Sequence, residues 1–296
     1  MGYRQVIIKK SEKLSLKDEQ LVIRKDNDDI KIPLEDINFI LIEDNTTNIT
    51  CKLLSKIGEY SICLLVCNDK FEPSSIMYPY NYHFKQLENL NYQLNLDEHS
   101  KQILCQQIIK TKITNEIKVL ELTEKDEYTI NKLIQFKDEV NPGDNTNREG
   151  LAAKMYFRSL FGNNFIRFSD DKINSALNYA YTIVKSSIVR TLAIYGLNTF
   201  LGVNHKSKVN NFNLAYDLIE PYRAIIDYYV YKIKDELVYP LNFDNRKKLL
   251  NVLNYVIIYN NKKVTIEYSI ERLVENYTRI LKEPNSKIEF PTIYYE

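Results

Sequence analysis

The feature that most constrains the fold of this chain is a change in the spacing of its apolar residues near residue 83. Before that point, short apolar runs such as 5–8 and 39–42 alternate with clusters of Asp, Asn, Gly and Lys, a pattern typical of β-strands. After it, apolar residues recur every three or four positions, which is the period of amphipathic helices. We therefore expect an α+β protein, in which a small N-terminal β-sheet domain precedes a larger all-helical domain.

The spacing also predicts where the elements lie. We expect strands at 5–10, 21–26, 30–37, 39–44, 48–54 and 60–68, and helices at 99–122, 128–140, 175–197, 212–234, 246–260 and 268–281, with a further helix headed by Glu149. The runs 39–42 and 62–66 are continuously apolar, which indicates strands buried on both faces. The predicted domains are a β domain at 1–77, a hinge at 78–90, a helical domain at 91–282 and an extended or loosely docked tail at 283–296.

Charge and hydropathy exclude several classes of protein. The chain has 40 Lys and Arg residues against 39 Asp and Glu residues, so attraction to nucleic acid must come from local patches. No apolar run approaches the length of a membrane span, and the first ten residues lack the apolar core of a signal peptide. We expect a cytoplasmic protein with no membrane partner.

A compact group of chemically capable residues lies between 201 and 224. His205 stands in a loop before a helix that carries Asp217 and Glu220, three positions apart on one helical face. Pro221 follows directly and should kink that helix, while Glu149 begins a helix far upstream. Carboxylates and an imidazole together can hold a hard or borderline divalent metal. The residues alone equally allow a solvated acidic face, a surface histidine and a glutamate that complements a helix dipole.

Basic residues accompany these acidic elements. A metal-dependent phosphodiester site needs anionic ligands for the metal and cations for the substrate backbone. The candidate DNA-binding residues are Arg148, Lys154, Arg158, Arg167, Lys206, Lys208 and Arg223. The ordinary explanation is that 40 basic residues fall near every element of the chain.

Three blocks carry a family resemblance. Residues 104–120, 147–157 and 174–227 resemble, in that order, the first long helix, the Glu-bearing motif and the long signature block of the CRISPR-associated integrase-endonucleases of spacer acquisition. The order of domains, β then helical, also matches over nearly the whole chain. The blocks are most similar to those of type II systems.

The resemblance implies a set of site residues. It assigns Glu149, His205 and Glu220 as catalytic metal ligands for Mg²⁺ or Mn²⁺, and Asp217 as a second-sphere residue or an alternate ligand. The sequence departs from the family pattern at Asn204, where a second histidine is frequent, and at Tyr216, where an aspartate is frequent. Neither departure removes an implied ligand.

The resemblance also implies a function and its partners. Members of this family insert short double-stranded DNA fragments as spacers into a CRISPR array, by attack of a 3′-hydroxyl on a phosphodiester in the repeat DNA. They act as homodimers with the small second Cas protein, and in type II systems other adaptation proteins and the RNA-guided effector nuclease are candidate partners. The alternative is a catalytically silent, helical DNA-binding scaffold. A di-metal carboxylate bundle is disfavoured because the chain lacks paired Glu-x-x-His motifs.

Overall fold

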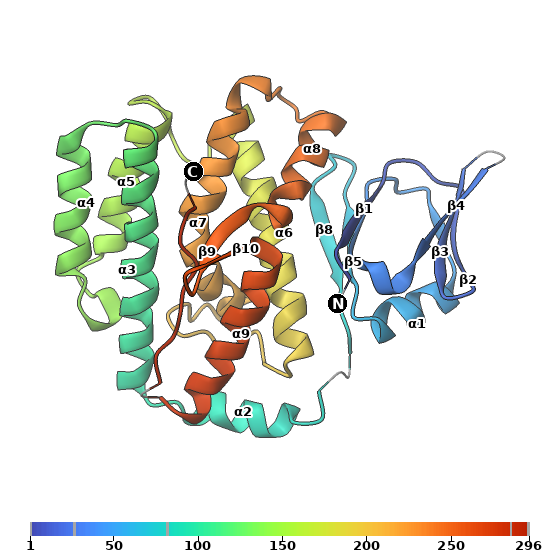
Figure 1. Ribbon diagram of the computed structural model, residues 1–296, viewed down its shortest axis with the longest axis horizontal. Helices are drawn as coiled ribbons and strands as arrows, with labels where there is room; N and C mark the ends of the chain where they lie inside the picture. Colours follow the sequence, from blue (N-terminus) through green and yellow to red (C-terminus); the bar gives the residue numbers. More distant parts are fainter. Residues whose placement is uncertain (1, 26–27, 81–82, 285, 295–296) are drawn as a thin grey trace. The chain divides into compact units, whose positions relative to one another are not determined.

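The computed structural model of the protein describes residues 2–25, 28–80, 83–284 and 286–294 (Figure 1). The chain divides into two compact units, Met1–Phe84 with Val189–Gly196, and Lys85–Ile188 with Leu197–Glu296. The first unit is built mainly of strands and the second mainly of helices, which confirms the predicted α+β class. Among the described residues, no helix is long and apolar enough to cross a membrane.

A sheet with a parallel centre runs through the first unit. Its described strands follow the order β1 (Arg4–Ile8), β5 (Ile37–Ile42), β7 (Cys63–Cys67) and β8 (Pro73–Met77). The centre strand β5 is parallel to both β1 and β7, and all of its residues are buried, as its unbroken apolar run predicts. The edge strand β8 lies where the sequence suggested only a route to the hinge. Its Pro73 is the first residue of the strand, a position where a missing N–H is tolerated.

A second sheet in the same unit has the order β4 (Asp28–Pro33), β3 (Gln20–Lys25), β2 (Lys13–Lys17) and β6 (Asn48–Ile49). Apolar side chains from both sheets and from helix α1 (Cys51–Glu59) form one core cluster. The strand predicted over 48–54 is wrong beyond Ile49, because the side chain of Thr50 accepts a hydrogen bond from the N–H of Leu53 and starts α1.

The second unit contains the long helices that the apolar period predicted. They are α2 (Gln86–Asn95), α3 (Glu98–Leu122), α4 (Glu127–Glu139), α5 (Arg148–Phe161), α6 (Lys172–Ile194) and α7 (Asn213–Ile233), of which only α2 was not expected. Residues 189–194 at the end of α6 belong to the first unit. Helix α3 packs against α4, α5 and α7, and Figure 1 shows α3, α4 and α5 side by side. Helix α7 continues through Pro221 as one helix.

The second unit is not wholly helical, which corrects one part of the prediction. Helix α8 (Phe243–Leu250) gives way to a hairpin of β9 (Val256–Tyr259) and β10 (Lys262–Thr265), followed by α9 (Ile266–Lys282). The hairpin turns at Asn260 and Asn261, both with positive φ, as a type I′ turn requires. The β-branched run before Asn260 therefore forms a strand, and the helix predicted over 246–260 is wrong in its second half.

The segment after α9 is extended but firmly packed. Ile288 and Ile293 are buried, and Thr292 forms a β-bridge with Ile258. The fully buried side chain of Asn115, on α3, donates to the carbonyls of Pro221 (2.9 Å) and Pro291 (3.0 Å) and accepts from the N–H of Ile293 (3.3 Å). One amide thus joins α3, α7 and the C-terminal segment, so the expectation of a loosely docked tail is wrong.

Candidate active site

Glu149 is presented by a tightly built helix start. The loop before α5 places Asn147 at the N-cap with a positive φ, and its side chain accepts from the N–H of Gly150. The carboxylate of Asp144 accepts from the N–H groups of Arg148 (2.9 Å) and Glu149 (3.0 Å). Because Asp144 and Asn147 satisfy these backbone donors, the side chain of Glu149 does not cap its own helix and can bind elsewhere.

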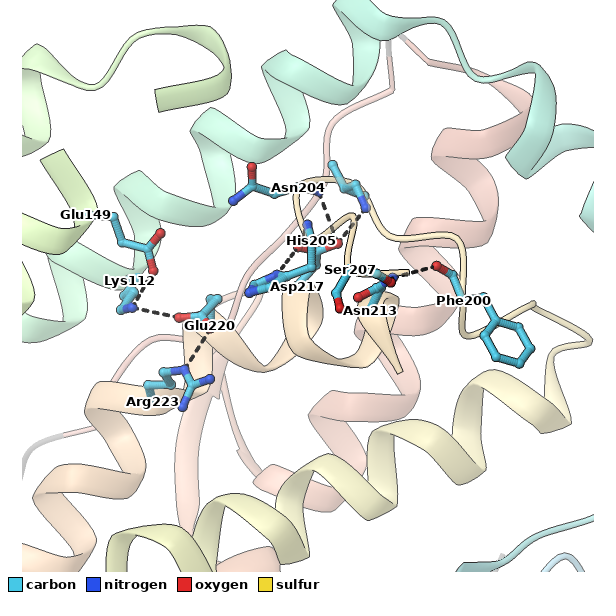
Figure 2. A network of polar contacts seen from close by, with 11 residues as sticks. Lys112, Glu149, Phe200, Asn204, His205, Ser207, Asn213, Asp217, Glu220 and Arg223 are labelled. Atoms are coloured by element: carbon cyan, nitrogen blue, oxygen red, sulfur yellow. Dashed lines mark hydrogen bonds and ion pairs between the residues drawn. The ribbon is translucent and has the colours of Figure 1, made fainter. Parts of the chain in front are cut away.

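The side chain of Glu149 meets that of Glu220 at a single ammonium group. Lys112 Nζ, from α3, lies 2.6 Å from Glu149 Oε1 and 2.7 Å from Glu220 Oε2 (Figure 2). The second oxygen of Glu220 accepts from Arg223 Nε at 2.8 Å. Helix α3, which contacts both α5 and α7, therefore brings two carboxylates around one cation.

Burial and charge set the protonation of this cluster. Burial alone would raise the pKa of Glu220, but the ammonium of Lys112 and the guanidinium of Arg223 outweigh it and hold that pKa at about 2. Burial alone would lower the pKa of Lys112, yet the carboxylates of Glu220, Glu149 and Glu116 keep it above its ordinary value. Both carboxylates of the bridge therefore face a permanent positive charge at neutral pH.

Sequence reasoning missed Lys112 as a site residue. Lys112 and Glu116 are buried on α3 among the apolar residues Ile108, Ile109 and Ile113. Charged residues are almost never fully buried without a partner. Two charges four residues apart on the apolar stripe of a helix were therefore the signal for a buried ionic cluster.

The second part of the site is the loop that carries His205. The buried carboxylate of Asp217 accepts from the backbone N–H groups of Val203, Asn204 and His205 and from His205 Nδ1, the last at 2.7 Å (Figure 2). A side chain at Gly202 would collide with the carbonyl oxygen of His205, so the loop needs glycine there. Asp217 thus fixes both the path of the loop and the direction of the imidazole ring.

The contact with Asp217 also determines which imidazole nitrogen can act. An ionised carboxylate can only accept, so Nδ1 carries the proton and Nε2 is the nitrogen that can coordinate or exchange a proton. The hydrogen bond to Asp217 raises the pKa of His205, against a lowering by burial, and the charges of Glu220 and Glu149 act in the same direction as that hydrogen bond.

A cavity of about 740 Å³ opens beside the bridged glutamates. Its lining combines Glu149 and Glu220 with the rings of Phe157, Phe165, Phe168, Tyr181 and Tyr216 and with Lys154, Arg158, Arg167, Lys185 and Arg223. The guanidinium of Arg167 lies 4.7 Å from the ring centre of Phe168, an exposed side chain on a backbone of positive φ. Rings next to cations are the composition of a surface that stacks bases and holds phosphates.

The predicted DNA-contact residues divide into two groups. Lys154, Arg158, Arg167 and Arg223 line the cavity. Arg148 is paired with Glu139 at 3.1 Å, and Lys206 is paired with Glu98 at 2.8 Å. Lys208 is exposed and is not among the residues that line the cavity. The aromatic lining was not foreseen from the sequence, since its rings come from a helix, a loop and two further helices.

Two further acids are buried at the cavity wall. Asp227 accepts a hydrogen bond from the hydroxyl of Tyr181, and burial raises its pKa to about 7. Burial raises the pKa of Glu116 to about 8, against the opposing charge of Lys112. Oxygen Oε2 of Glu116 is buried and has no hydrogen-bond partner in the part of the chain described here. Both acids line the cavity.

The donor set suits a divalent cation. One oxygen of Glu149 and one of Glu220 already share the ammonium of Lys112. Asp217 binds Nδ1 of His205 and leaves Nε2 for a ligand, the arrangement that usually supports a metal-binding histidine. Within the described residues, however, no three His, Cys, Asp or Glu side chains form a group that could hold a metal ion as they stand. The ligand assignment of Glu149, His205 and Glu220 stays a prediction, and the contacts of Asp217 support its assignment as a residue that orients His205.

Comparison with known proteins gives first the fold and then the family. The structure is similar to a casposase bound to its integration product, with a TM-score of 0.77, 18% identity and coverage of 97% of this chain and 92% of that one. It is also similar to a chain of a Cas6-RT-Cas1–Cas2 complex, with a TM-score of 0.74, 16% identity and coverage of 95% of this chain and 35% of that one.

Sequence similarity establishes the family. The family model described as CRISPR associated protein Cas1 matches residues 6–255. The CRISPR-associated endonuclease Cas1 of Neisseria meningitidis is 36% identical over 296 residues, which cover 99% of this chain and 97% of the relative. The chain belongs to the Cas1 family, as the resemblance in the sequence predicted.

Proposed function

We propose that this protein is a metal-dependent DNA integrase that inserts short DNA fragments as new spacers into a CRISPR array. The observation that carries the proposal is the convergence of Glu149 and Glu220 on one cation. On the same helix as Glu220, three positions earlier, Asp217 orients the imidazole of His205. The cavity that Glu149 and Glu220 line combines cations and aromatic rings, a composition that suits binding of a DNA strand. The similarity to a casposase bound to its integration product supports the same reaction class.

Glu149, Glu220 and Nε2 of His205 would hold a Mg²⁺ or Mn²⁺ ion. When bound, such an ion polarises a phosphodiester and helps a 3′-hydroxyl lose its proton. The imidazole is more compatible with Mn²⁺ than an all-oxygen site would be. Asp217 contributes by holding the proton on Nδ1, which keeps the ring direction and the tautomer fixed while Nε2 acts.

The other residues of the site act on the DNA. Lys154, Arg158 and Arg167 line the cavity and would bind phosphates, so that the strand passes the carboxylates. The exposed ring of Phe168 offers a surface on which an unpaired base can stack regardless of sequence.

Tyr216 stands where an aspartate is frequent in the family. Its hydroxyl accepts from Lys185 Nζ at 3.1 Å. This position therefore supplies an aromatic and cationic wall instead of an acid, which suits contact with a strand more than coordination of a metal.

The proposal extends to partners. We infer that the protein binds double-stranded DNA fragments and CRISPR repeat DNA, forms a homodimer and works with the second Cas protein, Cas2. The similarity to a chain from a complex that contains Cas1 and Cas2 supports the last of these. Type II adaptation proteins and the RNA-guided effector nuclease are further proposed partners, on the strength of the sequence blocks that resemble type II systems.

A strand-joining assay tests the function. Purified protein with Cas2 is incubated with a labelled DNA fragment and a plasmid that carries the repeat, with Mn²⁺, Mg²⁺ or EDTA. We expect labelled, joined products with either metal and none in EDTA or with Glu149→Ala. DNA binding without joining under every metal condition would instead identify the protein as a silent scaffold.

A further inference from the structure

Lys112 Nζ occupies the space between the two glutamates that are proposed as metal ligands. Its Nζ lies 2.6 Å from an oxygen of Glu149 and 2.7 Å from an oxygen of Glu220. Mg²⁺ binds carboxylate oxygens at about 2.0–2.1 Å, so an ion shared by the same two oxygens would occupy nearly the position of Nζ. The two cations cannot use this position together.

Lys112 has an alternative partner within reach. Glu116 lies four residues further along α3, the spacing at which helical side chains are neighbours. Its Oε2 is buried and has no hydrogen-bond partner within the described ranges, and both residues line the same cavity. The flexible, unbranched stem of lysine allows the ammonium to move while the helix stays in place.

A buried carboxylate oxygen without a partner is otherwise difficult to explain. Leaving such a group unsatisfied is unfavourable, and native structures contain few of them. It becomes understandable if the oxygen receives a donor in a second state of the site. An ammonium that moves from the glutamate bridge to Glu116 would supply this donor. Because the charge of Lys112 lowers the pKa of Glu116, the carboxyl group would then release its proton to solvent, and Lys112 would be paired in both states.

We propose that Lys112 is the counter-ion of the metal-free site and that it transfers to Glu116 when a divalent cation binds Glu149 and Glu220. This inference rests on the proposed metal site. According to this proposal, Glu149 and Glu220 always share a cation. This cation is the ammonium of Lys112 before the metal binds and the divalent ion afterwards. Lys112 is a positioning residue that competes with the metal, and Glu116 is the residue that receives it.

Calorimetric titration of the full chain with Mn²⁺, without DNA, tests the competition. Lys112→Met keeps the length of the side chain but removes the ammonium, and we expect it to bind Mn²⁺ more tightly than the wild type, on the order of tenfold, because a repelling charge is removed. Lys110→Met, a change on the same helix outside the cluster, should bind as the wild type does. Equal affinity of Lys112→Met and wild type would overturn the proposal.

Glu116→Gln tests the receiving residue. We expect weaker Mn²⁺ binding, by a few-fold, because the displaced ammonium is left without its partner, and this variant is informative even if Lys112→Met does not fold. In the Lys112→Met background, Glu116→Gln should change the affinity for Mn²⁺ little, because there is no displaced ammonium for Glu116 to bind. An equal weakening in both backgrounds would mean that Glu116 acts only by its charge and would contradict the transfer, as would unchanged affinity of Glu116→Gln alone.

These outcomes separate the inference from the function on which it rests. If the wild type binds Mn²⁺ and Glu149→Ala does not, the metal site stands, whatever the result for Lys112→Met. If the wild type itself binds no Mn²⁺, both the metal site and the transfer of Lys112 are wrong.

Discussion

Asp217 and Glu220 lie three positions apart on α7 and are both buried, yet they bind different kinds of partner. The carboxylate of Asp217 accepts hydrogen bonds from the backbone N–H groups of residues 203–205 and from His205 Nδ1. The carboxylate of Glu220 forms ion pairs with the ammonium of Lys112 and the guanidinium of Arg223. One turn of helix therefore carries an acid that shapes the loop and an acid that binds cations, and substitutions can separate the two roles.

Glu149→Gln and Glu220→Gln should both abolish metal-dependent joining but should differ in stability. The side chain of Glu149 is 25% exposed, whereas that of Glu220 is 6% exposed and binds two cations. Breaking the buried pairs of Glu220 should cost about 3–5 kcal/mol, and the partly exposed pair of Glu149 about 1 kcal/mol or less. Urea unfolding measures both, and equal decreases in stability would contradict the difference in burial.

His205→Gln should join DNA poorly and should remove part of the pH dependence of metal use. A proton and a metal compete for Nε2, and the contact with Asp217 raises the pKa of His205, so the proton is favoured already at pH values above the ordinary pKa of about 6.5. Lowering the pH should therefore raise the Mn²⁺ concentration that the wild type needs. Normal joining by His205→Gln, with unchanged pH and metal dependence, would reduce His205 to a loop residue.

Asp217→Asn is the companion to that experiment. The amide cannot attract the imidazole proton as strongly as a carboxylate, so the pKa of His205 should fall and the pH window of the competition should shift downward. Joining should weaken because the ring is held less firmly. A pH profile identical to that of the wild type would show that Asp217 does not control the protonation of His205.

Glu116→Gln should flatten the pH dependence of stability. The unfolded chain releases the Glu116 proton near pH 4.5, but the folded chain holds it to about pH 8. Between these values the folded state binds the extra proton, so the free energy of unfolding falls as pH rises, by about 1.4 kcal/mol per pH unit at most. The variant should therefore be more stable than the wild type at pH 8 but not at pH 4, as urea unfolding at the two pH values can check. An equal effect at both pH values would assign the change to packing.

Lys154→Ala should weaken DNA binding more than Lys208→Ala. Lys154 lines the cavity, whereas Lys208 does not, although both were candidates from the sequence. Removing one phosphate-binding cation should reduce the slope of log affinity against log salt by about 0.9 on duplex DNA. Fluorescence anisotropy at several salt concentrations gives these slopes, and matching slopes for the two variants would argue against the cavity as the path of the strand.

The helical period predicted α3, α5 and α7 well because each buries an apolar face along most of its length. It misplaced the region after Leu250, since the short β-branched run 256–259 fits a buried helix as well as a strand. The two asparagines that follow it were the deciding signal, because both central residues of a type I′ turn need positive φ.

The carboxylates and the histidine were predictable as a site only through the family resemblance. The lysine that bridges the two glutamates was not predicted as a site residue. Lys112 is 37 residues from Glu149 and 108 residues from Glu220 in sequence, so no local pattern encodes their meeting. What the sequence did contain was a lysine on an apolar helical stripe. A charge buried at that position needs a partner, but the sequence pattern does not show which residue the partner is.

The amide of Asn115 has a consequence for how the chain is made. Its partner Pro221 is synthesised 106 residues later and Pro291 176 residues later. At roughly 5–20 residues per second, the second interval lasts about 10–35 s. Until it ends, the side chain that joins α3 to α7 lacks part of its hydrogen bonding, so the growing protein should present an incomplete interior to ribosome-associated chaperones. Translation speed between the codons for Pro221 and Pro291 should therefore influence how much of the protein reaches its folded state.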